Sequence, residues 1–127
     1  MRAMPNDGGG QKCYLIGMDS KFTLADLERR IGDRATAPAA ESYTRQLLDK
    51  GPSQCAKKFG EEAVEAVLAV VGESRERVIA ESADVLYHLF VMLGYKGVAL
   101  QEVEAELARR FGISGIVEKQ ARMTKPE

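Results

Sequence analysis

The chain has 127 residues, of which 45% are hydrophobic and 29% are charged, as expected for one globular domain with a modest core. Its 18 Lys and Arg residues nearly balance its 19 Asp and Glu residues, which leaves a formal net charge of −1. This balance argues against proteins that bind nucleic acid or anionic membranes through overall charge, so any anion site must be local. A helical bundle of this size has a limited core, and we therefore expect a homodimer that buries further apolar surface.

The cysteines and the apolar segments indicate the compartment. Cys13 and Cys55 are far apart and have no His or Cys at metal-ligand spacing, which favours two reduced thiols over a disulfide framework or a zinc site. The apolar run around 14–16 is too short for a signal peptide, and the run 85–94 is too short to span a membrane. We therefore expect a soluble, cytoplasmic protein.

The chain divides into three parts by composition. Residues 1–20 contain Gly8, Gly9 and Gly10 but no apolar period, and they are expected to be a disordered leader. Residues 21–122 carry helical periodicity throughout and are expected to form a single α-helical domain. Residues 123–127 are expected to be a flexible tail.

Helices are predicted from apolar residues three or four positions apart. The expected ranges are 24 to between 32 and 38, 39–50, 52 to about 72, 75 to about 95, and 100–111. Thr23 and Ser74 are N-cap residues for the first and fourth of these helices, while Gly51 and Pro52 end the second and begin the third. No segment alternates apolar and polar residues as a strand would. The expected fold is all-α, a bundle of about four to five helices.

The third and fourth helices are predicted to pack through apolar stripes. Val64, Val67 and Val71 lie on one side of the third helix, and Val85, Leu86 and Leu89 are among those expected to be buried on the fourth. If the two helices run antiparallel across the short connection 72–74, these stripes face a shared core.

Two acidic pairs occupy equivalent positions on these helices. Glu62 and Glu65 precede one apolar run, and Glu81 and Asp84 precede the other. Residues three apart share a helix face, so the antiparallel arrangement would place both pairs beside one groove. This shared pattern of an acidic pair followed by an apolar run is too short to indicate a repeat fold.

Crowded carboxylates are favourable only with a cation. Each like-charge pair costs roughly 0.2–0.5 kcal/mol even on an exposed helix. Mg²⁺ prefers carboxylate oxygens, Mn²⁺ accepts the same ligands, and Mg²⁺ commonly shares its coordination shell with substrate phosphates. We therefore predict that Glu62, Glu65, Glu81 and Asp84 bind Mg²⁺, with Mn²⁺ as an alternative. Solvated acidic helix faces are the competing interpretation, since such faces are common.

Basic residues and the single histidine surround the acidic pairs. Lys58 lies on the same helix stripe as the first pair, and Lys50 lies at the turn before the third helix, so both are candidates for binding substrate phosphates. For Arg45 and Lys57 a phosphate-binding role and ordinary surface solvation are equally expected. His88 is expected to be a partly buried structural histidine, with a substrate contact or support of a metal ligand as the alternative.

Four linked motifs resemble one enzyme family. They are Ser42-Tyr43-Thr44-x-x-Leu47-Leu48-x-Lys50-Gly51-Pro52, Lys57-Lys58-Phe59-Gly60-Glu61-Glu62-Ala63-x-Glu65, Glu81-x-Ala83-Asp84-x-Leu86-Tyr87-His88-Leu89, and Arg109-Arg110-Phe111-Gly112-Ile113-Ser114-Gly115-x-x-Glu118-Lys119-x-x-Arg122. Together they resemble the phosphoribosyl-ATP pyrophosphohydrolases, within the MazG-like all-α nucleotide pyrophosphohydrolases. The similarity covers roughly residues 22–122.

The resemblance implies an activity and a site. It implies hydrolysis of phosphoribosyl-ATP to phosphoribosyl-AMP and pyrophosphate, the second step of histidine biosynthesis, by a homodimer that uses Mg²⁺. By position, the four predicted metal ligands match the metal-binding carboxylates of the family. Glu61 matches a residue that orients or deprotonates the attacking water, and we expect that water to attack the α-phosphorus. The metal-binding cysteine pattern of the cyclohydrolase that is fused to some relatives is absent from this sequence.

Two alternatives remain at this point. A general nucleoside triphosphate pyrophosphohydrolase would use the same acidic platform with a different base pocket. A non-enzymatic helical dimerisation module would leave the acidic stripes merely solvated, so Mg²⁺ would not stabilise it.

Overall fold

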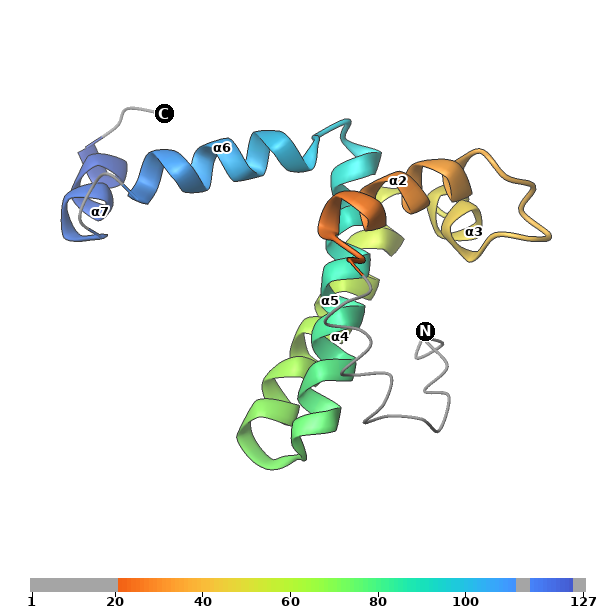
Figure 1. Ribbon diagram of the computed structural model, residues 1–127, viewed down its shortest axis with the longest axis horizontal. Helices are drawn as coiled ribbons and strands as arrows, with labels where there is room; N and C mark the ends of the chain where they lie inside the picture. The colour runs from red at the N-terminus through yellow and green to blue at the C-terminus, as the bar shows by residue number, and fades with distance from the viewer. Residues whose placement is uncertain (1–20, 112–114, 125–127) are drawn as a thin grey trace.

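The computed structural model describes residues 21–111 and 115–124, and every regular element in this part of the chain is an α-helix (Figure 1). The helices are α2 (Leu24–Ala35), α3 (Tyr43–Asp49), α4 (Pro52–Gly72), α5 (Arg75–Tyr95), α6 (Leu100–Phe111) and α7 (Gly115–Thr124). The predicted all-α fold is confirmed. Six helices are described, where four to five were expected, because residues 115–124 form a helix although they show no strong apolar period.

The predicted helix ends agree with the structure except at α3. That helix begins at Tyr43 rather than at residue 39, because the Ser42 hydroxyl oxygen accepts a hydrogen bond from the backbone N–H of Arg45 and so caps the helix. Gly51 has a φ of +94°, the left-handed conformation expected of a glycine that follows a helix. The expected limit of the domain at residue 122 falls inside α7, whereas residues 1–20 and 125–127 lie outside the described residues.

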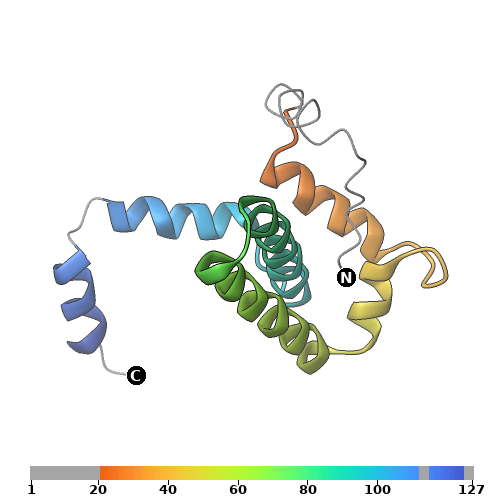
Figure 2. The same ribbon diagram turned by 90° about the horizontal axis from the view of Figure 1, so that it is seen from below.

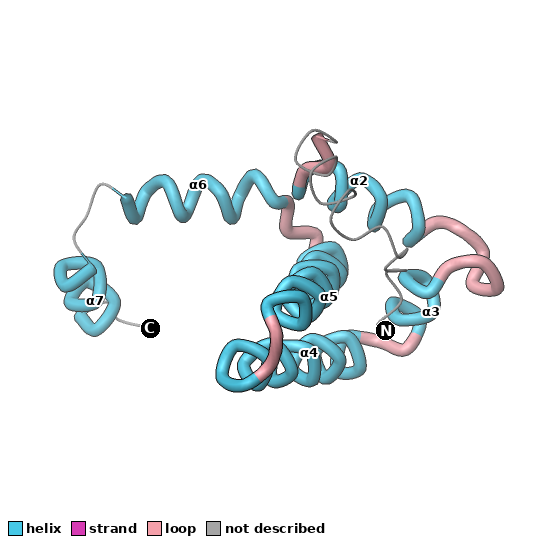
Figure 3. Tube along the Cα trace, turned by 60° about the horizontal axis from the view of Figure 1, so that its bottom comes forward, coloured by secondary structure: helices cyan, strands magenta, loops and turns pink. Residues whose placement is uncertain are grey.

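The centre of the fold is an antiparallel pair of long helices. α4 and α5 have 21 residues each and lie side by side along their whole length (Figures 1 and 2). The connection between them is short because Ser74 caps α5 directly after α4 ends. α2 and α3 pack over the end of this pair where α4 begins and α5 ends, and α6 runs away from the pair toward α7 (Figure 3).

The apolar core lies where these four helices meet. Its buried members come from each of them: Ile31, Leu47, Cys55, Tyr87, Phe90 and Val91. The thiol of Cys55 donates a hydrogen bond to the carbonyl oxygen of Leu47 at 3.3 Å. Cys55 is thus a buried free cysteine, as expected, and Cys13 lies outside the described residues.

The predicted burial of the α4 stripe is not found within the chain. The apolar side chains of the second half of α4 are each more than half exposed: Val64, Val67, Leu68, Val70 and Val71. On α5, Ile79 and Leu86 are also exposed. The reason is that α2 and α3 cover only one end of the helix pair, and none of the described helices packs over the other end (Figure 1).

α5 is long and apolar enough to satisfy a membrane-span criterion, with a mean hydropathy of 1.3. The apolar run 85–94, which is by itself too short to span a membrane, is only part of this helix. A core helix of a soluble protein passes the same test, and α5 carries two buried carboxylates, Glu81 and Asp84, and the buried His88. α5 is therefore the core helix of this bundle.

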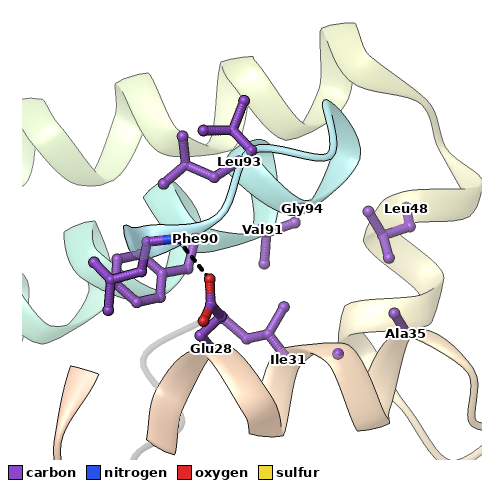
Figure 4. Close-up of a pocket in the computed structure, with 11 residues that line it drawn as sticks. Glu28, Ile31, Ala35, Leu48, Phe90, Val91, Leu93 and Gly94 are labelled. Atoms are coloured by element: carbon purple, nitrogen blue, oxygen red, sulfur yellow. Dashed lines mark hydrogen bonds between the residues drawn. The ribbon is translucent and has the colours of Figure 1, made fainter. Parts of the chain in front are cut away.

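α6 is attached to the bundle at its first residue. The carboxylate of Glu28 accepts a hydrogen bond from the backbone N–H of Leu100 at 2.6 Å, which satisfies one of the free N–H groups at the start of α6. Beside this contact, Glu28 and Ile31 of α2 face Val91 and Leu93 of α5 across an apolar pocket of about 210 Å³ (Figure 4). Its lining is nearly all aliphatic, so it is a packing gap rather than a site for polar chemistry.

His88 is packed among aromatic rings. It is 1% exposed, and its ring lies edge-on to those of Tyr87 and Tyr43, with centroids 5.0 and 6.4 Å away. Burial lowers its pKa from 6.5 to about 4, and the positive charge of Lys58 acts in the same direction. His88 is therefore neutral at physiological pH, and it is more deeply buried than the partly buried position that we expected.

We expect Ser42→Ala to lower the free energy of unfolding by about 1–2 kcal/mol, because Ser42 both caps α3 and donates a hydrogen bond from its buried hydroxyl to the Arg34 carbonyl oxygen. Urea denaturation measures this loss. Ser53→Ala, at an exposed position in the first turn of α4, is the control and should cost much less. Equal losses in the two variants would contradict this role of Ser42.

Stability should fall on acidification between pH 6.5 and about 4 in part because of His88. The unfolded histidine binds a proton below pH 6.5 that the folded one takes up only near pH 4, so protons favour the unfolded chain in this window and have no such effect above it. The free energy of unfolding in chelator, followed against pH, should fall less steeply for His88→Gln, by up to roughly 3 kcal/mol over the window. Parallel curves would contradict the buried neutral state.

Candidate active site

Three carboxylates from α4 and α5 meet in the interior. Glu62, Glu81 and Asp84 each offer an oxygen atom within 4.8 Å of the other two. They are 2%, 1% and 7% exposed, so water reaches them poorly. The predicted antiparallel packing of the two acidic stripes is therefore present, because positions 81 and 84 share one face of α5 and that face is turned toward Glu62 of α4.

Two cations balance part of this charge. The ammonium nitrogen of Lys58 lies 3.4 Å from a carboxylate oxygen of Glu62, one helical turn away. The guanidinium group of Arg77 donates a hydrogen bond to Glu81, again one turn away. Arg77 was missed from the sequence, although its position four residues before Glu81 is the spacing of an ion pair on a helix. Lys58 and Arg77 each offset the charge of one carboxylate of the cluster.

The other predicted acidic residues lie near this cluster but differ in exposure. Glu65 is half-buried one turn beyond Glu62 and is not part of the three-carboxylate group. The side chain of Glu61 is 49% exposed, and its carboxylate lies 3.6 Å from Lys58 and 4.0 Å from Lys57. Glu61 is thus the carboxylate beside the cluster with the most access to water.

Of the predicted phosphate-binding residues, the structure brings only Lys58 to the carboxylates. Lys57 points to Glu61, and Lys50 is exposed at the C-terminal end of α3. Arg45 donates hydrogen bonds to Asp49 at 2.9 Å and to the carbonyl oxygen of Ala35 at 3.1 Å, so it ties α3 to the end of α2. This structural contact satisfies much of the hydrogen-bonding capacity of Arg45.

A pocket of about 560 Å³ adjoins the cluster, which is a typical volume for a small-molecule site. It is lined by residues of α2, α3 and α5 and of the segments just before α2 and α3: Phe22, Leu27, Arg30, Ile31, Arg34, Glu41, Ser42, Tyr43, Thr44 and Tyr87. The rings of Tyr43 and Tyr87 are stacked at 6.5 Å, and the Tyr87 and Thr44 hydroxyl groups are hydrogen-bonded. Sequence reasoning missed this pocket, although the Ser42-Tyr43-Thr44 motif marks one wall.

Tyr43 connects the pocket with the cluster. Burial raises the pKa of its phenol group; Lys58 lowers it, whereas the charges of Glu62, Glu61 and Asp84 raise it. The Tyr43 ring lines the pocket and also lies 6.4 Å from that of His88, one helical turn from Asp84 on α5. A substrate with a polyanionic end and an aromatic end could occupy both places at once.

The donor set fits a hard divalent cation. It consists of carboxylate oxygens from two helices, with no sulfur ligand among them, and three of these oxygens lie within 4.8 Å of one another. Carboxylates that hold such an ion beside a phosphate chain are suited to phosphoanhydride hydrolysis.

Comparisons with known proteins agree with this chemistry. The family described as phosphoribosyl-ATP pyrophosphohydrolase matches residues 24–111. The phosphoribosyl-ATP pyrophosphatase of Azorhizobium caulinodans is 60% identical over 104 residues, which cover 82% of this chain and 95% of that protein. The phosphoribosyl-ATP pyrophosphatase of Roseobacter denitrificans is 55% identical over 105 residues, or 83% of this chain and all of that protein.

The match includes α4 and α5, which carry the carboxylates, and α2 and α3, which together with α5 line the adjoining pocket; of the residues that line the pocket, only Phe22 precedes the match. The chain belongs to the phosphoribosyl-ATP pyrophosphohydrolase family.

Proposed function

We propose that this chain hydrolyses phosphoribosyl-ATP to phosphoribosyl-AMP and pyrophosphate, the second step of histidine biosynthesis, in the cytoplasm. The observation that carries the proposal is the buried group of Glu62, Glu81 and Asp84, which lies within the segment matched by the family. The relatives named above carry the name of this activity and share more than half of their aligned residues with the chain.

The proposed cofactor is Mg²⁺, with Mn²⁺ as a possible substitute. Glu62, Glu81 and Asp84 would hold the ion, and Glu65, one turn from Glu62, would complete the predicted set. When bound, the ion would neutralise the negative charge that develops on the pyrophosphate leaving group. The exclusion of water from these carboxylates strengthens their attraction for a cation.

Protein side chains would provide the remaining chemistry. Glu61, exposed beside the cluster, would accept a proton from the water that attacks the α-phosphorus, and the bond from that phosphorus to the bridging oxygen of pyrophosphate would break. Lys58 would hold an outer phosphate as a cation, with Lys50, Lys57 and Arg45 as more distant candidates. The complete burial of His88 supports a role in positioning Tyr43 rather than contact with phosphates.

The proposed assembly is a homodimer formed through the exposed apolar end of the α4 and α5 pair. Monomeric soluble proteins rarely expose contiguous apolar patches of this kind. A second copy is the occupant that we favour, because the stripe of Val64, Val67 and Val71 is nearly free of charged residues and is therefore complementary to itself.

The activity is tested by pyrophosphate release from phosphoribosyl-ATP with and without Mg²⁺. We expect release by the natural chain that depends on the ion and falls by at least about 100-fold in Glu62→Gln and Glu81→Gln, because each change removes one charged ligand. Glu76→Gln, an exposed change on the first turn of α5, is the control and should remain active. Glu65→Gln shows whether the predicted fourth ligand takes part.

Two outcomes would contradict the proposal in different ways. Release from a panel of nucleoside triphosphates but not from phosphoribosyl-ATP would favour a general nucleotide pyrophosphohydrolase. A dimerisation module would show no release and no effect of Mg²⁺ on thermal unfolding, whereas a metal site gains about 2.7 kcal/mol of stability when the free ion is 100 times its dissociation constant.

The dimer is tested by sedimentation equilibrium. We expect twice the chain mass of 13.9 kDa for the natural protein and a shift to monomer for Val67→Glu, because a buried carboxylate at the centre of the patch would lack a partner. Leu24→Glu, an exposed apolar position on α2, is the control that should remain dimeric. A natural chain that sediments as a monomer at tens of micromolar would contradict the assembly.

A further inference from the structure

The pocket beside the acidic cluster has a cationic rim. Arg30 and Arg34 are four residues apart on α2 and so share one helix face, and both line the pocket. Both are exposed, and neither forms an ion pair with another residue in the described part of the chain. By contrast, Arg29 on the same helix is paired with Asp26. Two unpaired guanidinium groups at the rim of a pocket are well placed to bind an anion.

The wall of the same pocket is aromatic. Tyr43 and Tyr87 are stacked on each other there, and Phe22 lies at the edge. Tyr43 also lies against the ring of His88, which is one helical turn from Asp84 on α5, so this wall lies near the carboxylates. The tyrosine rings and the two arginines of α2 thus line one pocket, and Tyr87 lies three residues from Asp84 on α5.

We propose that Arg30 and Arg34 bind the phosphate of the additional phosphoribosyl group of phosphoribosyl-ATP, while Tyr43 and Tyr87 contact the adenine ring. This inference rests on the proposed function. It assigns the pocket as the part of the site that distinguishes the substrate from ATP.

The charges of the substrate require two separate sites. Phosphoribosyl-ATP has a triphosphate at one end and a second phosphate on its extra ribosyl group, and two such anions repel each other. The triphosphate belongs at the carboxylates with their cation, so the second phosphate needs cations of its own. Guanidinium groups bind phosphate oxygens through paired hydrogen bonds, which a single lysine cannot do. Glu41, on the same rim, is placed to accept hydrogen bonds from ribose hydroxyl groups.

Two measurements separate this pocket from the reaction centre. Calorimetry gives the affinity for phosphoribosyl-AMP, which keeps the extra phosphate, and inhibition by pyrophosphate reports binding at the carboxylates. We expect Arg34→Ala and Arg30→Ala each to weaken phosphoribosyl-AMP binding by about 10- to 100-fold, the usual effect of a lost charged hydrogen bond. The inhibition constant of pyrophosphate should change by less than about 2-fold. The KM for phosphoribosyl-ATP should rise by a factor similar to the loss of affinity for phosphoribosyl-AMP.

Arg29→Ala is the matched control, because it removes a paired guanidinium from the same helix and should leave both constants unchanged. Arg34→Lys keeps the positive charge but loses the paired hydrogen bonds of the guanidinium group. Its affinity for phosphoribosyl-AMP should therefore lie between those of the natural chain and Arg34→Ala. Since both pocket arginines are exposed, these variants should fold as the natural chain does. Unchanged binding of phosphoribosyl-AMP, or an equal loss for pyrophosphate, would overturn the assignment. A natural chain that does not turn over phosphoribosyl-ATP would overturn the proposed function and this inference with it.

Discussion

The burial of three carboxylates between two helices is the constraint on which the rest of the structure depends. Removing such groups from water is expensive, and their mutual repulsion adds to the cost. Lys58 and Arg77 each stand one helical turn from a member of the group and offset part of it. The α4 and α5 pair must keep its antiparallel register, because a shift of one helix along the other would move Glu62 away from Glu81 and Asp84, whereas each cation moves with the carboxylate on its own helix.

Most of the fold was predictable because it depends on local signals. Thr23, Ser42 and Ser74 carry capping side chains, and Gly51 adopts the positive φ that ends a helix. The predicted start of α3, at residue 39, is wrong because the apolar period averages over several turns and does not mark a single residue. The helix begins where Ser42 caps it. α7 was missed for the opposite reason, since 10 residues contain too few turns for a reliable apolar pattern.

The site was predictable along each helix but not between helices. The spacing of Glu81 and Asp84 predicted that they share one face of α5. The matching acidic pair on α4 predicted that Glu62 lies opposite them. The pocket joins residues of α2, α3 and α5 that are far apart in sequence, so periodicity gives no information about it. The exposure of the α4 valines could not be predicted for a similar reason. An apolar stripe indicates that its side chains are buried, but it does not indicate whether the same chain or another one buries them.

α6 is attached to the bundle mainly at its first residue, which bears on the stability of this helix. It begins at the contact between Leu100 and Glu28, contains no buried side chain, and is held otherwise by its own pairs of Glu106 with Arg109 and Arg110. A 12-residue helix with so little packing is marginal in water. Its amide groups should therefore exchange with solvent faster than those of α4 and α5 in a lone chain, and slow exchange along this arm would report the proposed association as well as folding.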